Sequence, residues 1–431
     1  MKIMTRPKNW PRILLWSYTI GTACLHIWLW IRTSPVKNGL VKVLPQINNP
    51  TSTTNSPLIS IIVPARNEER GILRCIDSLL TQDYDNYEVI VVNDGSTDKT
   101  GDILAELQRT HVHKERLRVL HLQDELPSGW AGKPHALHSG VEQARGEWLL
   151  FTDADTWHMP NALRSAITQA LTEECDMFSL ITTQELPSFW ERTLMPMAFL
   201  LISTLYPLKL VNNPNSKIAL ANGQYILIRH KVYADLGGYA RTELQGTLVD
   251  DLDLANTVKS NGYKLRLIDG NGLVHVRMYQ SFGEIWRGWR KNVYVGNRGG
   301  WPHVLLQLLT FPIIAVVPFL LPFYALYVGL TCKRNTKGGV STREASLAAI
   351  IELTPLLAHR AWTNQNKNVP WYYALTHPLA AVIFEGILAQ SMWRIVTGKG
   401  VDWRGRQYYN SGGDHNRHQS GQQAKHPILS D

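Results

Sequence analysis

The sequence predicts an α/β protein with a mostly parallel, Rossmann-like sheet, held at a membrane by apolar helices on both sides of it. From Leu58 onward, strand-like and helix-like segments alternate, which is the pattern of a parallel sheet covered by helices. Ile13–Ile31 and Val304–Leu330 contain no Lys, Arg, Asp or Glu, and each is long enough to cross a bilayer. Hydrophobic residues make up 44% and charged residues 18% of the 431 residues, so the chain is globular rather than disordered.

The charge and the cysteines exclude several classes of protein. The formal net charge is +9, but no lysine-rich run or nucleic-acid motif is present, so we expect no nucleic-acid partner. Many basic residues flank apolar runs, which favours contact with anionic lipid headgroups. The 4 cysteines are scattered without metal or redox spacing and predict neither a disulfide framework nor a zinc site.

The first apolar stretch reads as a retained anchor, because no small-residue cleavage site follows it. Val304–Leu330 carries three prolines and is expected to be kinked or tilted. Trp371–Val396 is a third candidate span, although it contains Glu385 and Arg394. Leu347–Ala358 is too short to span and is expected at the interface. The alternative for each segment is a buried core helix.

These features divide the chain into five parts. We expect a membrane anchor at 1–42, a polar linker at 43–57, an α/β domain at 58–300, membrane helices at 301–398 and a polar, disordered tail at 399–431. The basic residues on the two sides of the anchor are nearly balanced and do not fix its orientation.

Four strands are predicted within the α/β domain, at Leu58–Val63, Tyr87–Val92, Leu117–Leu122 and Trp148–Thr152, and the first of them is expected to be buried. Helices are predicted between and after them, at Asn67–Leu80, Thr100–Leu107, Lys133–Ala144 and Pro160–Leu171. Phe189–Leu210 is apolar but broken by prolines and is expected to be an interfacial or acceptor-facing helix. Further helices are expected at Asp250–Asn261 and Gly283–Val295.

Carboxylates follow two of these strands. Asp94 comes directly after the second strand, where a ligand of a parallel sheet would lie, although an Asx-type turn explains Asn93-Asp94-Gly95 equally well. Asp153 and Asp155 follow the fourth strand and are suited to a shared Mg²⁺ or Mn²⁺ ion, since both metals prefer oxygen ligands. The alternative for this pair is a helix cap before Pro160.

A third acidic group, Asp250-Asp251, opens a predicted helix. Acidic residues there complement the helix dipole, which is the purely structural explanation. The functional explanation is a general base, because a partly buried carboxylate can take the proton from an attacking hydroxyl group.

Taken together, these residues resemble the inverting family 2 glycosyltransferases with the GT-A fold, from about Ser60 to Asn292. Ile62–Glu69 looks like the family's opening nucleotide-binding segment, and the resemblance implies a nucleotide-sugar donor, with a UDP-sugar expected. It further implies that Asp94 binds the nucleoside, that Asp153 and Asp155 hold the diphosphate through Mg²⁺ or Mn²⁺, and that Asp251 is the base. The residues thereby expected at the donor are Pro64, Ala65, Arg66, Glu68, Asp94, Lys133 and Asp153.

The sequence departs from this family at two places. Asp250 replaces the Glu of the family's Glu-Asp pair. The distal Gln/Arg-x-x-Arg-Trp motif of processive members is present only as Arg287, Arg290 and then Lys291, which favours single transfer over polysaccharide synthesis. Both arginines are acceptor-side candidates, and the alternative is a basic helix beside the membrane.

Shorter motifs resemble one branch of the family, the bacterial carotenoid glycosyltransferases and their hopanoid-associated relatives. These motifs are Gly129–Lys133, Ala221–Gln224, Arg277–Tyr279, Thr376–Pro378 and Trp403–Arg406. The resemblance implies a lipid acceptor, most simply a carotenoid, with a hopanoid or glycolipid as the alternative, and makes Asn222, Gly223 and Gln224 acceptor-side candidates. His275 lies near the third motif and is a further candidate metal ligand, although a lone His is more often structural.

Two other functions would fit part of this pattern. A sugar-nucleotide pyrophosphorylase would carry a glycine-rich loop after the first strand, whereas no glycine occurs there before Gly71. An inactive membrane scaffold would have no need of the four carboxylates of Asp94, Asp153, Asp155 and Asp251. The α/β domain is expected to face the cytoplasm, where nucleotide sugars are made, with two later spans returning the tail to that side.

Overall fold

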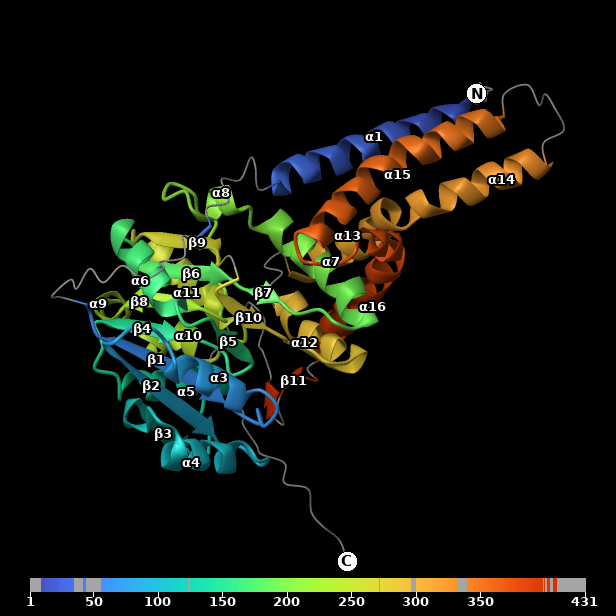
Figure 1. Cartoon of the computed structure of the whole chain (residues 1–431). Helices are drawn as coiled ribbons and strands as arrows, with labels where there is room; N and C mark the ends of the chain where they lie inside the picture. Colours follow the sequence, from blue (N-terminus) through green and yellow to red (C-terminus); the bar gives the residue numbers. More distant parts are fainter. Residues whose placement is uncertain are drawn as a thin grey trace, which may run out of the picture.

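The structure is a computed structural model, and it combines an α/β domain with a helical bundle that projects from it (Figure 1). It describes residues 9–34, 42–43, 56–122, 125–270, 272–295, 300–331, 339–397, 399, 401–403 and 406–408. The predicted tail from Ser411 to Asp431 and most of the predicted linker lie outside these residues.

The α/β domain is built on a seven-stranded sheet with the order β3-β2-β1-β4-β8-β6-β9. All neighbouring strands are parallel except at β8, which runs antiparallel to both β4 and β6. The strands are β1 (Ile59–Ala65), β2 (Tyr87–Asp94), β3 (Leu117–Leu122), β4 (Trp148–Phe151), β6 (Met177–Ile181), β8 (Ile226–Arg229) and β9 (Leu265–Asp269). The mostly parallel α/β sheet is therefore confirmed, and all four predicted strands occur within two residues of their predicted ends.

Helices cover both faces of the sheet, and for this reason every residue of β2 is buried. One core lies against α3 (Ile72–Leu80), α4 (Thr100–Thr110) and α6 (Ala162–Thr172). The other lies against α5 (Gly132–Val141), α9 (His230–Asp235) and α11 (Asp250–Ser260). Shorter helices, η1 (Lys114–Arg116), α8 (Leu208–Val211), η2 (Gly238–Ala240) and α10 (Thr242–Gln245), connect these elements.

The helix predicted from Asn67 begins later, at Ile72. Asn67 has a φ of 55°, in the left-handed region that interrupts a right-handed helix, and the preceding residues form a loop at the end of β1. This loop matters for the site described below.

Two small sheets complete the strands. β5 (Thr156–His158), β10 (Val274–Val276) and β7 (Thr183–Gln184) form a three-stranded sheet with β10 in the middle. β11 (Val401–Trp403) pairs antiparallel with β12 (Arg406–Tyr408). The backbone of Val43, at the start of the predicted linker, donates a hydrogen bond to Asp269 (2.9 Å), and its side chain is fully buried, so this residue belongs to the α/β core.

Among the residues that the structure describes, three helical stretches are long and apolar enough to cross a membrane: Trp10–Thr33, Trp301–Thr331 and Trp371–Arg394. The first is α1 (Trp10–Thr33). The second contains α13 (Gly300–Ala315), η3 (Val317–Leu320) and α14 (Leu321–Thr331), and the break at η3 follows Pro312 and includes Pro318, as expected for a proline-interrupted span. The third contains η4 (Trp371–Thr376) and α16 (His377–Val396).

Two further helices join the domain to the bundle. α7 (Phe189–Leu205) ends before Pro207, so the predicted Phe189–Leu210 helix is divided as its prolines suggested. α12 (Phe282–Val295) leads from the α/β domain toward α13 and packs along α16.

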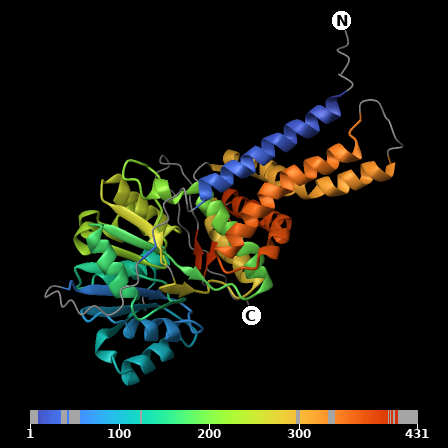
Figure 2. The same cartoon turned by 45° about the horizontal axis from the view of Figure 1, so that its top comes forward.

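One helix is longer than predicted. The segment expected to lie at the interface, Leu347–Ala358, is the middle of α15 (Thr342–Gln365), a helix of 24 residues that lies beside α1. A serine cap at Ser341, closed by Glu344, starts this helix well before its apolar middle. In both views α1, α14 and α15 extend together away from the sheet (Figures 1 and 2).

Candidate active site

A cavity of about 170 Å³ opens where β1, β2 and β4 end. Ala65 and Asp94 are the last residues of β1 and β2, and Asp153 follows β4 by two residues. The cavity is lined by Pro64, Ala65, Arg66, Glu68, Asp94, Gly132, Lys133, Ala136, Asp153, Ala154, Asp155 and Lys291. In open α/β sheets this edge is where ligands bind, so the cavity is the candidate active site.

The loop after β1 is fastened to the loop after β2. Three of its backbone N–H groups donate to side chains there: Asn67 to Ser96 (3.0 Å), Glu68 to Thr100 (2.8 Å) and Glu69 to Asp98 (3.1 Å). The Arg66 guanidinium donates to the carbonyl oxygen of Asp94. Because the backbone on both sides of Asp94 is fixed in this way, its carboxylate, 5% exposed, is held at the cavity.

Lys133 joins two acidic groups that are far apart in the sequence. It lies in the first turn of α5, and its Nζ is 2.8 Å from Oδ1 of Asp153 and 3.2 Å from Oδ2 of Asp250. Burial favours the neutral amine, but the carboxylates of Asp153, Asp250 and Asp251 outweigh it and raise the pKa of Lys133 well above its usual value. A permanent positive charge at the start of a helix is well placed to receive a phosphate group.

Asp251 is half-buried and tightly held. Its Oδ2 accepts a hydrogen bond from the Gly223 N–H (3.0 Å), and its Oδ1 accepts one from the N–H of Leu252 (2.8 Å). Burial and repulsion from Asp250 raise the pKa of Asp251 to about 6, although Lys133 and the two N–H groups act in the opposite direction. The carboxylate is therefore ionised at neutral pH yet basic enough to take a proton.

Gly223 is the residue that allows this approach. A Cβ atom at Gly223 would lie 3.1 Å from Nζ of Lys133 and 3.2 Å from Oδ2 of Asp251. Any side chain there would press on both groups at once, so the close contact between the loop, the lysine and the carboxylate depends on glycine.

The residues present fit a divalent cation. Asp153 and Asp155 line the same cavity, and Thr156 fixes the turn between them by donating to the carbonyl oxygen of Asp153 (2.8 Å). Within the described part of the chain, no group of three or more His, Cys, Asp or Glu side chains is arranged to hold a metal. Two carboxylates without a full protein cage suit Mg²⁺ or Mn²⁺, which complete their coordination with phosphate oxygens and water.

Eight residues predicted for the donor or the metal line this cavity: Pro64, Ala65, Arg66, Glu68, Asp94, Lys133, Asp153 and Asp155. His275 is not among them. Its Nδ1 lies 3.1 Å from Oε1 of Glu185, its Nε2 lies 2.9 Å from the Gly272 carbonyl oxygen, and its ring stacks on Trp157. Both ring nitrogens already face protein atoms, so the candidate metal ligands are Asp153 and Asp155.

Of the acceptor-side candidates in the Asn222–Gln224 loop, two contact neighbouring strands and one contacts the candidate base. Asn222 donates from Nδ2 to the carbonyl oxygen of Leu180 (2.9 Å), and Gln224, 3% exposed, accepts from Gln184 (3.2 Å). These two side chains hold the loop against β6 and β7, while Gly223 between them faces the candidate base.

The two arginine candidates on α12 lie outside the cavity lining. Arg287 is exposed, and Arg290 packs toward α16, with its Nη1 3.4 Å from Oε1 of Gln390 and its carbonyl oxygen accepting from Ser391 (2.6 Å). The next residue, Lys291, lines the cavity instead, and burial lowers its pKa although nearby carboxylates oppose this. Sequence reasoning did not select Lys291 as a site residue, because the pattern of α12 does not tell which of its basic residues faces the domain.

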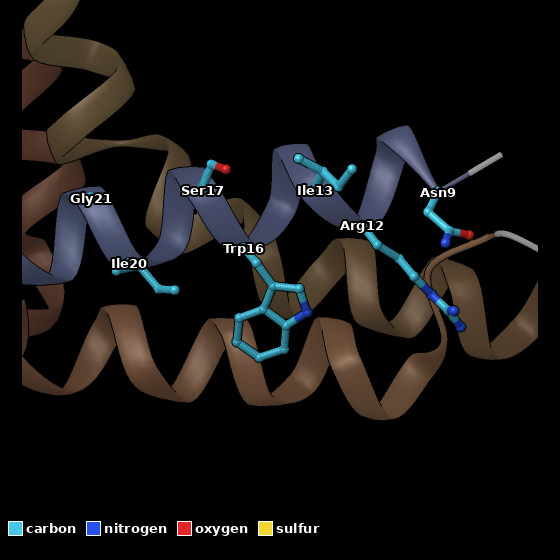
Figure 3. Close-up of a pocket in the computed structure, with 7 residues that line it drawn as sticks. All are labelled: Asn9, Arg12, Ile13, Trp16, Ser17, Ile20 and Gly21. Atoms are coloured by element: carbon cyan, nitrogen blue, oxygen red, sulfur yellow. The ribbon is translucent and has the colours of Figure 1, made fainter. Parts of the chain in front are cut away.

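A second depression, of about 730 Å³, runs along the N-terminal half of α1 (Figure 3). In Figure 3 Arg12, Trp16 and Ile20 project from one side of the helix, and Ile13 and Ser17 from the other. Its lining contains no carboxylate and belongs to the bundle rather than to the strand ends, so it is not the reaction site.

Comparison with known proteins agrees with this geometry. Residues 60–237 match the sequence model of glycosyl transferase family 2. The chain is 27% identical over 375 residues to 4,4'-diaponeurosporenoate glycosyltransferase from Staphylococcus aureus strain N315, covering 84% of this chain and 91% of that protein. The same enzyme from strain MRSA252 is 26% identical over the same length.

Solved structures give a more distant likeness. A mannosyltransferase from Pyrobaculum calidifontis in complex with GDP-Man and Mn²⁺ matches 87% of this chain and 99% of its own, at 20% identity and a TM-score of 0.48. TarS from S. aureus in complex with UDP matches 83% of this chain and 98% of its own, at 17% identity and a TM-score of 0.38. At these TM-scores, neither likeness bears on the function of this chain.

Proposed function

We propose that this chain, which belongs to glycosyltransferase family 2 through residues 60–237, is a membrane-bound enzyme. It moves a sugar from a nucleotide-sugar donor, a UDP-sugar, to a hydroxyl group of a carotenoid, with inversion at the anomeric carbon. The observation that carries this proposal is the joining of the strand-end carboxylates to the Asp250-Asp251 pair through Lys133. That arrangement brings a phosphate-binding charge and a general base to one cavity.

The donor binds at the strand ends in this proposal. Asp94 receives the nucleoside in the cradle formed by the loops after β1 and β2, and Lys133 and Lys291 face the diphosphate. Asp153 and Asp155 would hold Mg²⁺ or Mn²⁺, which neutralises negative charge on the leaving diphosphate when it is bound. Two lysines and the start of α5 supply the rest of the positive charge around that group.

Asp251 is the general base. The acceptor hydroxyl approaches Asp251, gives up its proton to the carboxylate and attacks the anomeric carbon from the side opposite the leaving diphosphate. A single displacement of this kind inverts the configuration. The two backbone N–H groups hold the carboxylate in one orientation, and Asp250 contributes by keeping the pKa of Asp251 raised.

The acceptor is assigned from the relatives and from the bundle. The relatives whose match covers 84% of this chain are named as 4,4'-diaponeurosporenoate glycosyltransferases. A carotenoid is too insoluble to diffuse to an enzyme in water, so its enzyme must be held at the bilayer, and the three apolar helical stretches provide the means. The α/β domain faces the cytoplasm, where nucleotide sugars are made.

The test is deletion of the gene in its host, followed by parallel analysis of pigments and polar lipids. We expect a glycosylated carotenoid to disappear and its free hydroxyl form to accumulate. Complementation with the wild-type gene should restore the product, whereas the Asp251→Asn gene should not. Unchanged pigments beside an altered hopanoid or glycolipid would move the acceptor to that class, and no change in any glycolipid or pigment would contradict sugar transfer to lipid.

A further inference from the structure

We propose that α15 crosses the membrane beside α1, so that Trp10 and Thr342 emerge on the face opposite the α/β domain. The inference depends on the membrane placement proposed above but not on the identity of the sugar or the acceptor. It adds a membrane-crossing helix that length and composition alone do not identify, since α15 is not among the three apolar stretches.

The two helices lie side by side over most of their length (Figures 1 and 2). Three polar contacts join them: Arg12 Nε to Glu344 Oε2 (3.2 Å), Thr22 Oγ1 to Glu352 Oε1, and Thr33 Oγ1 to His359 Nε2 (2.8 Å). Residue numbers rise together in these pairs, so the helices run parallel. Each has 24 residues and is therefore about 36 Å long, enough to cross a hydrocarbon core of about 30 Å.

The two faces of α15 are reversed relative to a helix in water. Ile350 is 62% exposed, and Leu347 and Ile351 are each 42% exposed on the outer face. Glu352 and Arg360 have no exposed surface. Apolar side chains outside and charged side chains inside are the distribution that a bilayer demands, because lipid offers no partner to a charge.

The buried charges explain why composition does not reveal α15. Arg343 and Glu344 lie in its first turn, and His359 and Arg360 lie in its last third. Only Glu352 lies near the middle of the span, and it accepts a hydrogen bond from Thr22 of α1. The Arg360 guanidinium donates to the carbonyl oxygen of Thr193 in α7 (2.6 Å), so α15 also holds the helix that joins the bundle to the domain.

α14 supplies the path away from the domain, and α15 supplies the return. α14 packs against α15, and its outer face is apolar, with Phe323, Leu326, Tyr327 and Leu330 all at least 60% exposed. Apolar exposure on α1, with Ile13 and Leu14 above 50%, continues this belt around the bundle. The occupant that fits a belt of this kind around three adjacent helices is the acyl chains of the bilayer.

Cysteine labelling in sealed vesicles of each orientation tests the inference on the full-length enzyme. Cys24 and Cys332 are first replaced by alanine, while Cys75 and Cys175 are buried and are kept. Single cysteines are then introduced by Asn9→Cys, Arg343→Cys and, as the reporter for the α/β domain, Glu115→Cys, all at exposed positions. A membrane-impermeant maleimide is applied, and sugar transfer is measured on the same vesicles.

We expect Asn9→Cys and Arg343→Cys to be labelled only in vesicles in which Glu115→Cys is protected. Labelling of Arg343→Cys together with Glu115→Cys, while Asn9→Cys is labelled from the other face, would overturn the crossing of α15. Labelling of all three from one face would show that the α1–α15 pair does not cross at all. Because transfer is measured separately, either negative result leaves the assignment of the reaction to be judged on its own.

Discussion

Nζ of Lys133 lies 3.2 Å from Oδ2 of Asp250 and, on its other side, 2.8 Å from Oδ1 of Asp153. One ammonium group therefore links the end of β4, where the donor diphosphate is proposed to bind, to the start of α11, where the proposed base lies. A phosphate group that binds Lys133 would offset part of the positive charge that lowers the pKa of Asp251. Donor binding and the basicity of Asp251 are therefore electrostatically connected.

The first prediction concerns the base. Asp251→Asn should lower kcat by about 10²–10⁴-fold, the usual contribution of general base catalysis, because the amide keeps the shape but cannot take a proton. Affinity for the nucleotide part of the donor should be retained, as measured by titration calorimetry with a nucleoside diphosphate and Mn²⁺. Asp253→Asn is the matched control, since it removes one charge from the same helical turn and should leave kcat within about threefold of wild type. Equal losses in the two variants would contradict the role of Asp251.

The second prediction is a pH dependence set by Asp251. The base must be ionised to act, and its pKa is about 6, so kcat/KM should fall as the pH drops below about 6, by about tenfold for each further pH unit. Lys133 lowers the pKa of Asp251, and removal of its charge by Lys133→Met should move this acidic limb to higher pH. Lys133→Arg keeps the charge and should leave the limb near pH 6. A limb that stays in place in Lys133→Met would rule out this coupling.

The third prediction concerns Lys291, which lines the candidate donor cavity from α12. Lys291→Met should raise KM for the nucleotide sugar by about tenfold or more, because one charge facing the diphosphate is lost, while Lys291→Arg should restore part of the affinity. Arg287→Met is the control, since that side chain lies on the same helix but is exposed and outside the cavity lining. If Arg287→Met raises the KM for the donor as strongly as Lys291→Met, the cause is the overall positive charge of α12 and not a contact of Lys291 in the cavity.

The fourth prediction concerns the metal. Excess chelator should abolish transfer, and Mg²⁺ or Mn²⁺ should restore it, because Asp153 and Asp155 would hold the cation against the diphosphate. Asp155→Ala should lose both activity and the Mn²⁺-dependent increase in nucleotide affinity without changing the melting temperature greatly. Glu185→Ala, which removes the partner of His275 outside the cavity, should leave Mn²⁺ binding unchanged. Full activity in chelator would refute the metal site.

The sequence predicted the core of the sheet closely, and it predicted most of the residues that line the cavity at the strand ends. Short apolar runs predicted β1, β2 and β4, because a strand buried on both faces is mostly apolar. Residues that directly follow such strands in a parallel sheet must meet at one edge, so Asp94 and Asp153 could be assigned to one cavity before any coordinates. The charge-free stretch in α1 was equally plain, since it depends only on local composition.

Other features depended on which distant segments pack together. The antiparallel direction of β8, the contact of Lys133 with Asp250, and the turn of Lys291 rather than Arg290 into the cavity are set by three-dimensional packing. His275 shows the same limit, since its neighbours Glu185 and Trp157 become adjacent to it only in the small sheet.

The sequence by itself therefore determined the α/β class, the edge of the sheet where the candidate site lies and the charge-free stretches that could span a membrane. Each of these follows from the period and composition of a single segment or from a general rule for parallel sheets. Only the tertiary structure decided which cation joins the carboxylates and that Glu344 and Glu352 of α15 contact α1. These contacts join residues that are far apart in the sequence and depend on how two segments pack. The pattern of a single segment does not show which other segment it packs against.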